Sequence, residues 1–360
     1  MHDDASWMQR ALTLAAQGQG AVEPNPMVGA VLLDASGKLL SEGWHRRYGG
    51  PHAEVDALTG VGDAARSRTL YVTLEPCSHY GKTPPCTDAV LRSGVKRVVV
   101  AMPDPFPQVN GRGLAILRDA GIDVTVGIEQ SAAERLNAPY LKRVRTGQPW
   151  VIAKWAMTLD GKIATATGDS RWISGPGSRA RVHELRGRVD GILVGRGTLV
   201  ADDPLLTARP AGPRVASRII LTGSGQLPEK VKLRETITEA PVIIVAPKDA
   251  GGALPGWVAD GAEHLPLAEG AEAIPSLLKE LGRRGMTNLL VEGGAGVLGS
   301  FFTAGAVDEA WVYVAPKVVG GAGPGPVAGP GVERIAEAWQ AASLSMERIE
   351  DDVWIRARFR

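Results

Sequence analysis

Two cysteines and one histidine have the residue types and spacing for metal chemistry. Cys77 and Cys86 are the only cysteines of the chain, and His52 precedes them. Thiolate and imidazole suit zinc, and three protein ligands leave a fourth position for water. Glu54 follows His52 by two residues, too close in sequence to be a comfortable second ligand but well placed to reach that water. A zinc-polarised water beside a carboxylate is suited to hydrolysis at neutral pH.

The order of these residues partly matches the signature of zinc deaminases, H-x-E followed by P-C-x-x-C. His52, Glu54 and the Pro-Cys step at Cys77 fit, whereas the gap before Cys86 is longer than in that signature. Buried inert thiols and a hydrogen-bonded core histidine are the alternative. However, Cys77 follows a predicted strand over 69–74, and the two prolines before Cys86 favour a helix start there. Metal ligands can converge at such positions, so we expect a zinc ion.

His79 lies between the two cysteines and has two interpretations. As a fourth ligand it would close the site and make the zinc structural. A substrate or loop role agrees better with Glu54, which would otherwise have no water to act on. A non-enzymatic zinc scaffold also remains open, and a Glu54→Gln variant that keeps zinc but loses activity would reject it.

The composition is that of an ordinary soluble globular protein of two domains. The chain has 360 residues, 44% hydrophobic and 22% charged, with a formal net charge of +1. Balanced charge argues against nucleic-acid binding, and no apolar run approaches the ~20 residues of a membrane span. The acidic N-terminus lacks a signal-peptide pattern, so we expect a cytoplasmic enzyme with reduced thiols. Turn residues over 145–149 place the domain limits at 1–146 and 147–360.

Alternating strands and helices predict an α/β fold in both domains. In the first domain we expect helices over 7–17, 52–58, 84–93, 113–120 and 131–144, and strands over 27–33, 38–43, 69–74, 97–101 and 123–126. In the second we expect strands over 150–157, 191–195, 218–222, 241–246, 287–291 and 307–315, sheet-forming sequence over 344–357, helices over 178–186 and 273–281, and loops over 211–216, 250–256 and 320–326.

A glycine-rich turn in the second domain has the form of a phosphate-binding loop. Gly294-x-Gly296-x-x-Gly299 follows the predicted strand over 287–291 and opens a helix. Glycines let the backbone approach a ligand, and N–H groups at a helix start can hold a phosphate. A plain turn is the alternative. No acidic residue stands about 20 residues on to bind a ribose, which favours NADPH over NADH.

Two further residues stand out by their position. Asn25 lies between two prolines, at the mouth of a predicted strand that leads toward the zinc site, and is either a turn residue or a substrate contact. Lys154 lies inside an apolar strand, where a lysine is unusual; it could support proton transfer or bind a sugar.

Two segments resemble a known family. Residues 51–58, PHAEVDAL, and 71–86, YVTLEPCSHYGKTPPC, are similar to the bifunctional deaminase/reductase of riboflavin biosynthesis. That family also has the long gap between the cysteines, and the resemblance continues over nearly the whole chain. It implies an N-terminal cytidine-deaminase-like three-layer domain and a C-terminal dihydrofolate-reductase-like domain. Thr222 departs from the family, which carries aspartate at this strand end.

The resemblance also implies two reactions and their residues. The first is zinc-dependent deamination of 2,5-diamino-6-(5-phosphoribosylamino)pyrimidin-4(3H)-one. The second is NADPH-dependent reduction of 5-amino-6-(5-phosphoribosylamino)uracil to the ribitylamino product. The implied NADPH contacts are Ala156, Trp172, Thr198, Asp202, Gly294, Ala295, Gly296, Val297, Leu298, Gly299 and Ser300. The implied substrate contacts are Asn25, Ser170, Arg186, Leu206, Arg209 and Glu292, to which we add Lys154.

Arg186 and Arg209 make physical sense for the substrate's phosphate, since a guanidinium matches phosphate geometry. Solvated surface arginines are the alternative for both. We expect small-molecule phosphoribosyl pyrimidines as partners, no nucleic acid or membrane, and a homo-oligomer. The competing function is a zinc nucleic-acid deaminase with an appended nucleotide-binding module, which would require a basic groove.

Overall fold

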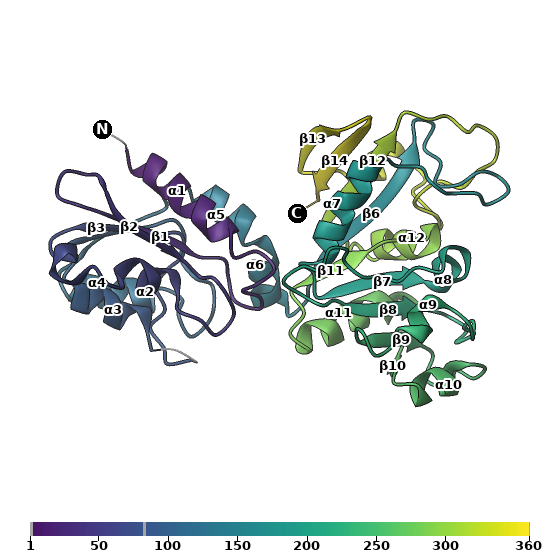
Figure 1. The fold of residues 1–360 in the computed structure, drawn as a ribbon, viewed down its shortest axis with the longest axis horizontal. Coiled ribbons are helices and arrows are strands. Elements are labelled where there is room, and N and C mark those ends of the chain that lie inside the picture. Colours follow the sequence, from purple (N-terminus) through teal and green to yellow (C-terminus); the bar gives the residue numbers. More distant parts are fainter. Residues whose placement is uncertain (1–2, 82–83, 360) are drawn as a thin grey trace. The chain divides into compact units, whose positions relative to one another are not determined.

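The structure is a computed structural model that describes residues 3–81 and 84–359. Its internal contacts divide the chain between Thr146 and Gly147 into two compact units (Figure 1). Both units are α/β, as predicted, and each is described by itself. Within the described residues, no helix is both long and apolar enough to span a membrane.

The first unit is built on a five-stranded mixed sheet. The strand order is β2-β1-β3-β4-β5, with β1 antiparallel to β2 and β3, and with β3, β4 and β5 parallel. Its elements are α1 (Asp4–Ala16), β1 (Gly29–Leu33), β2 (Leu39–Trp44), α2 (Ala53–Leu58), β3 (Thr69–Val72), α3 (Cys86–Ser93), β4 (Arg97–Val100), α4 (Arg112–Asp119), β5 (Asp123–Val126), α5 (Gln130–Leu136) and α6 (Ala138–Thr146).

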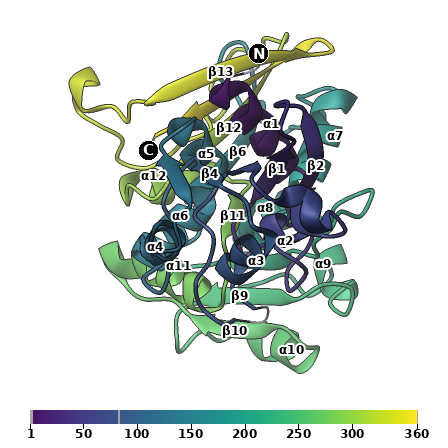
Figure 2. The same ribbon diagram turned by 90° about the vertical axis from the view of Figure 1, so that its left-hand side faces the viewer.

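Helices cover both faces of this sheet. In Figure 1, α1 and α5 lie on one face, while α2, α3 and α4 lie on the other. Two glycines allow this close packing: a Cβ on Gly29 would lie 2.0 Å from the Ala11 carbonyl oxygen, and one on Gly43 would lie 2.4 Å from the Ala57 nitrogen. Helices α2 and α3 lie side by side in both views (Figures 1 and 2). Their adjacency matters because each begins at a candidate metal ligand.

The single helix expected over 131–144 is wrong, because the chain forms α5 and α6 with a break at Asn137. The buried Asn137 side chain accepts a hydrogen bond from the Met27 backbone nitrogen at 2.8 Å and donates one to the Met27 carbonyl at 2.9 Å. This amide pairs with the backbone just before β1 as a neighbouring strand would. An apolar helical pattern does not reveal such a long-range partner.

The second unit is built on a nine-stranded sheet of order β10-β9-β8-β7-β11-β6-β12-β14-β13. The strands from β10 to β12 are parallel, and β14 and β13 close one edge antiparallel. The elements are β6 (Trp150–Thr158), α7 (Pro176–Arg186), β7 (Gly191–Gly195), α8 (Arg196–Asp202), β8 (Ser217–Leu221), α9 (Lys232–Glu235), β9 (Val242–Ala246), α10 (Leu254–Ala259), β10 (Glu263–Pro266), α11 (Ala273–Arg283), β11 (Asn288–Val291), α12 (Ala295–Thr303), β12 (Glu309–Ala315), β13 (Ser343–Ile349) and β14 (Asp352–Arg358).

One expectation for this unit is wrong. The loop expected over 250–256 ends in α10, where a proline in the first turn and the fully buried Trp257 favour a helix. The sheet-forming stretch expected over 344–357 is confirmed: it forms two strands, β13 and β14, joined by a turn at Glu350 with φ of 54°. Strand β10 and helices α8 and α9 were not expected; β10 and α9 are only four residues long.

Candidate functional site

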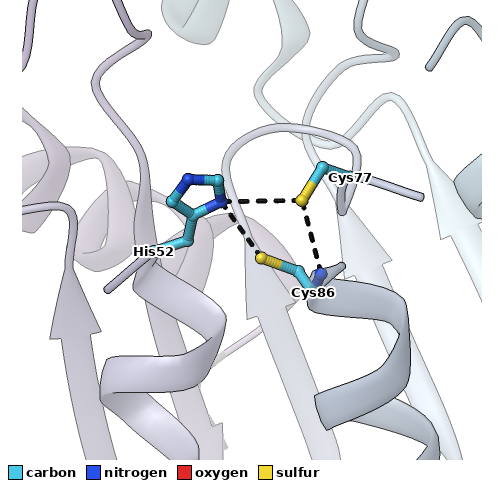
Figure 3. A group of neighbouring side chains, drawn as sticks. All are labelled: His52, Cys77 and Cys86. Atoms are coloured by element: carbon cyan, nitrogen blue, oxygen red, sulfur yellow. Dashed lines mark hydrogen bonds between the residues drawn. The ribbon is translucent and has the colours of Figure 1, made fainter. Parts of the chain in front are cut away.

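The three expected metal ligands meet at the ends of three elements of the first unit. His52 is the N-cap of α2, Cys86 is the first residue of α3, and Cys77 lies in the segment between β3 and α3. The His52 Nδ1 atom lies 3.2 Å from the Cys86 sulfur and 3.6 Å from the Cys77 sulfur (Figure 3). The three ligand atoms all lie within 4.8 Å of one another.

These separations fit a tetrahedral zinc site. Zinc–nitrogen and zinc–sulfur bonds of ordinary length place two such ligand atoms about 3.6 Å apart at a tetrahedral angle. The observed 3.2 and 3.6 Å therefore require little movement of His52, Cys86 or Cys77. Nδ1 is the histidine atom that faces both sulfurs.

The protonation of the cysteine pair is set by its own contacts. A hydrogen bond from Cys86 lowers the pKa of the Cys77 thiol, aided by His52, whereas the pKa of Cys86 is raised by Cys77 and by burial. The hydrogen bond to Cys77 raises the pKa of His52. Since zinc binds thiolates, metal binding would release the protons that the thiols still carry.

Glu54 lies in the first turn of α2, buried beside the ligand cluster. Burial, followed by the negative charge of Cys77, raises the pKa of its carboxyl to about 7. A carboxyl group with a pKa near the working pH can both take up and return a proton. Glu54 therefore has the position and acidity of a general acid/base.

Asn25 is held by a histidine that the sequence analysis did not single out. Its Nδ2 atom lies 3.2 Å from the Nε2 atom of His45, and the Nδ1 atom of His45 lies 2.9 Å from the Pro51 carbonyl oxygen. The His45 and His52 rings meet edge to face, with centroids 5.1 Å apart. Burial lowers the pKa of His45. Asn25 is thus linked through one ring to the residue before a metal ligand.

A buried carboxylate fixes the loop beside Cys77. Glu75 accepts hydrogen bonds from four backbone nitrogens, at distances of 2.9 to 3.4 Å. The donors are Asp104, Gly111, Gly113 and Leu114. This carboxylate therefore ties the end of β3 to the loop after β4 and to the start of α4. A single Glu-Pro-Cys step gave no sign of this role.

His79 is not in the ligand cluster found among the described residues. Its ring packs against Phe106, with centroids 5.8 Å apart. A loop role therefore agrees better with its surroundings than a fourth ligand does. The neighbouring residues 82 and 83 lie outside the described ranges.

In the second unit, three charged residues proposed as substrate contacts influence one another: Lys154 in the middle of β6, Glu292 directly after β11, and Arg186 at the end of α7. Arg186, the last residue of α7, bonds Glu292 through two nitrogens at 2.6 and 2.7 Å. Burial opposes ionisation of Glu292, but Arg186 and Lys154 more than offset it and lower the pKa of that carboxyl. Burial lowers the pKa of Lys154 on β6, against the attraction of Glu292. The three charges influence one another and form one cluster.

Arg209 lies in the loop after α8 and remains exposed. Its Nη1 atom donates to the Thr207 hydroxyl at 2.8 Å, and its Nη2 atom lies 3.5 Å from the Nε2 atom of His183. His183 lies one turn before Arg186 on α7 and also meets the Thr207 carbonyl at 3.1 Å. Arg186 also reaches the Thr207 carbonyl, at 3.4 Å, so Thr207 connects the two arginines, a role that the sequence did not indicate.

The glycine-rich turn begins α12, with Gly294 as N-cap. A Cβ on Gly296 would meet nothing within 4 Å, so there is open space at the helix start. By contrast, Leu298 is buried in the core, and a Cβ on Gly299 would lie 1.6 Å from the Ala328 carbonyl oxygen. The first residues of the turn therefore face space that a ligand could occupy, and the later ones serve packing. Ala295, Val297 and Ser300 complete this turn, with the Ser300 hydroxyl donating to the Gly296 carbonyl.

The remaining expected contacts are spread over several segments. Thr198 and Asp202 lie on α8, where a Cβ on Gly294 would lie 3.3 Å from the Thr198 hydroxyl. Ala156 lies on β6, and Trp172 is 63% exposed between β6 and α7. Ser170 precedes it, and Leu206 is buried with φ of 53°. The structure therefore brings Thr198 to the glycine turn.

Thr222 stands where the resemblance implied aspartate. Its buried hydroxyl accepts hydrogen bonds from the backbone nitrogens of Ser224 and Gly225, at 3.3 and 3.2 Å. An aspartate carboxylate often caps a turn in this way, and threonine does so more weakly. The turn after β8 therefore keeps a side-chain cap.

Comparison with known proteins assigns both units. Residues 1–102 match the cytidine and deoxycytidylate deaminase zinc-binding region, and residues 149–354 match the RibD C-terminal domain. The riboflavin biosynthesis protein RibD of Haemophilus influenzae is 40% identical over 97% of this chain and 96% of its own length. The chain belongs to the RibD family. The RibD of Escherichia coli is 39% identical over 97% of this chain and 98% of its own length.

Solved RibD structures agree with this assignment. The Acinetobacter baumannii RibD has a TM-score of 0.88 and 36% identity, covering 99% of this chain and 98% of its own. A diaminohydroxyphosphoribosylaminopyrimidine deaminase/5-amino-6-(5-phosphoribosylamino)uracil reductase from Thermotoga maritima has a TM-score of 0.86 and 35% identity, covering 98% of each chain. The protein is therefore a bifunctional deaminase/reductase of riboflavin biosynthesis, with a zinc-binding deaminase domain and a reductase domain.

Proposed function

We propose that the first unit hydrolytically deaminates 2,5-diamino-6-(5-phosphoribosylamino)pyrimidin-4(3H)-one. The second unit then reduces the product, 5-amino-6-(5-phosphoribosylamino)uracil, with NADPH. The observation that carries the proposal is the convergence of His52, Cys77 and Cys86 beside the buried Glu54. The Thermotoga maritima relative is named for the same two activities.

In the deamination, His52, Cys77 and Cys86 would hold zinc, which when bound makes a water molecule more acidic. Glu54 would take a proton from a water molecule held there, whose oxygen bonds to C2, the ring carbon that carries the amino group to be lost. Glu54 then returns the proton to the amino nitrogen, the carbon–nitrogen bond breaks, and ammonia leaves. The buried carboxyl group beside the ligand cluster can carry out both transfers.

In the reduction, a bound NADPH would supply the hydride that C1′ of the ribosyl group receives. The bond from C1′ to the ring oxygen opens, and that oxygen takes a proton, so the ribosyl group becomes ribityl. Arg209, exposed in its loop, would hold the phosphate, while Lys154 and the Arg186–Glu292 pair would contact the sugar. Such positioning of the substrate is a large part of catalysis.

The assignment of NADPH rests on the glycine turn and on the acids that follow it. Asp308 accepts from the Val151 nitrogen at 2.7 Å, and Glu309 bonds Trp311, Arg356 and Arg358. Both acids therefore serve the sheet and are not placed to bind a ribose hydroxyl. The lack of a ribose-binding acid after the turn supports a 2′-phosphate and hence NADPH.

The decisive test is product analysis by mass spectrometry, with the diaminopyrimidine substrate and with or without NADPH. We expect the deaminated product alone without NADPH, and the ribitylamino product with it. Glu54→Gln should lower the deaminase kcat by ~10²–10⁴ and leave zinc content unchanged. An active Glu54→Gln variant would assign proton transfer to another group.

A further inference from the structure

His45 joins two parts of the deaminase site and is itself closed to solvent. His45 is only 2% exposed. One ring nitrogen, Nδ1, lies 2.9 Å from the Pro51 carbonyl oxygen, and the other, Nε2, lies 3.2 Å from the Asn25 amide nitrogen. Pro51 directly precedes the metal ligand His52, and Asn25 is a proposed substrate contact.

These two partners fix which ring nitrogen carries the proton. The Pro51 carbonyl oxygen can only accept a hydrogen bond, so the Nδ1 atom of His45 must donate. A neutral imidazole has one N–H group, so Nε2 is left as an acceptor. The donor that faces it is the NH₂ group of Asn25.

The same reasoning fixes the orientation of the Asn25 amide. With NH₂ bound to His45, the carbonyl oxygen Oδ1 is the end left over. Among the described residues, none donates a hydrogen bond to this oxygen. Asn25 can then offer an acceptor, and not a donor, to a bound molecule.

We propose that His45 is a positioning residue that turns the Asn25 oxygen toward an N–H or O–H group of the substrate and holds the backbone before His52. This inference rests on the proposed deamination and on Asn25 as a substrate contact. The two bonds of His45 have separate consequences: the Asn25 bond governs substrate affinity, and the Pro51 bond governs the metal ligand.

Two substitutions separate these bonds. In His45→Asn the amide nitrogen reaches about the place of Nδ1, which keeps the Pro51 bond and loses the Asn25 bond. In His45→Gln the longer side chain reaches the place of Nε2, which keeps an acceptor for Asn25 and loses the Pro51 bond. The full-length protein is used, and its reductase activity on the deaminated substrate reports that the second unit of each sample is intact.

For His45→Asn we expect the deaminase KM to rise about tenfold, with kcat within about threefold and one zinc retained, since a lost hydrogen bond changes binding by about this much. For His45→Gln we expect KM to change little and zinc affinity to fall by about 10–100-fold, as when a group that orients a metal ligand is lost. Adding Asn25→Ala to His45→Asn should raise KM no further. Adding it to His45→Gln should raise KM as much as it does in the wild type.

The matched control is His264→Asn in the second unit, where His264 Nε2 meets the Ala246 carbonyl at 3.3 Å. It should leave deaminase KM and zinc affinity unchanged. An unchanged KM in His45→Asn, or an additive effect of Asn25→Ala in that variant, would overturn the proposal.

Nuclear magnetic resonance of the zinc-loaded wild type tests the tautomer without any substitution. Long-range proton–nitrogen correlations of the His45 ring should show protonated Nδ1 and bare Nε2. A proton on Nε2 would overturn the proposal even if the variants fail to fold. If the wild type fails to deaminate the pyrimidine, the proposed function falls, while the tautomer measurement still decides the role of His45.

Discussion

Arg186 and Glu292 form a two-point ion pair inside the reductase unit, with nitrogen–oxygen distances of 2.6 and 2.7 Å. The resemblance implies that both residues contact the substrate, yet their side chains already form two hydrogen bonds with each other. The third guanidinium nitrogen of Arg186 lies 3.4 Å from the Thr207 carbonyl. We therefore expect Arg186 to act as part of a fixed pair and Arg209 to be the arginine that binds the phosphate.

Replacing Arg209 with alanine should raise the reductase KM for the phosphorylated substrate about ten- to a hundredfold, the loss expected for charge-assisted hydrogen bonds. NADPH affinity should barely change. Steady-state kinetics with the phosphorylated substrate and a dephosphorylated analogue measure this. Equal weakening for both substrates would show that Arg209 serves folding.

Arg186→Ala should change the stability of the protein, whereas Arg209→Ala should change substrate affinity. It leaves Glu292 buried without its partner, and such a loss typically costs about 3–5 kcal/mol of stability. A denaturant titration should therefore show destabilisation in Arg186→Ala and little change in Arg209→Ala.

Cys77→Ser should abolish deamination and leave reduction intact, because only the metal cluster of the first unit loses a ligand. Elemental analysis of the wild type should find one zinc per chain, and the variant should lose it. The supplied deaminated substrate should still be reduced. Wild-type deamination without bound zinc would contradict the metal assignment.

Gly296→Val should block NADPH binding, because a side chain would occupy the open space where α12 begins. Binding is measured by nicotinamide fluorescence, and reduction by loss of nicotinamide absorbance. Gly251 is the matched control, since its Cβ would also meet nothing within 4 Å and it lies in a distant loop. If Gly296→Val and Gly251→Val bind NADPH equally, the phosphate role of the turn is wrong.

Lys154→Met should reduce reductase kcat by about 10²-fold or more, if Lys154 acts on the reacting sugar.

The effect of Lys154→Met on the free energy of unfolding depends on pH. The pKa of Lys154 is lowered by burial, so between that value and 10.5 the unfolded chain binds more protons, and wild-type stability rises with pH. The free energy of unfolding of Lys154→Met, compared with that of the wild type at the same pH, should therefore be more favourable at pH 7 than at pH 10.

Urea unfolding at pH 7 and 9.5, followed by tryptophan fluorescence, measures the difference. Seven of the nine tryptophans lie after residue 146, so the signal reports mainly the second unit. A stability difference that is independent of pH would contradict the buried-lysine argument.

Much of the fold could be predicted because hydrophobic patterns and turn residues are local signals. Strand β5 has the predicted bounds, 123–126, and β7 the predicted 191–195. Some errors concern short elements with weak local signals, and the break between α5 and α6 concerns a contact that is distant in sequence. The break at Asn137 depends on a backbone partner 110 positions away, which no periodicity shows.

The same limit applies to the site. Cysteine and histidine spacing predicted the residues that converge on one point, because few residue types bind zinc. His45 and Glu75 escaped notice because a lone histidine and a lone glutamate have many ordinary roles. Their roles appear only from their hydrogen-bond partners. His45 bonds Asn25 and Pro51, and Glu75 bonds four backbone nitrogens.

The Asn137 amide sets a limit on how the deaminase half can be shortened. The zinc-binding region matched by sequence ends at residue 102, yet the start of β1 depends on Asn137 for both of its Met27 hydrogen bonds. Tyr140 on α6 likewise donates to the buried Asp104 at 2.8 Å. A fragment truncated at residue 102 would leave the Met27 backbone groups without their Asn137 partner and would remove the Asp104–Tyr140 pair altogether, so an expression boundary for the deaminase belongs after α6.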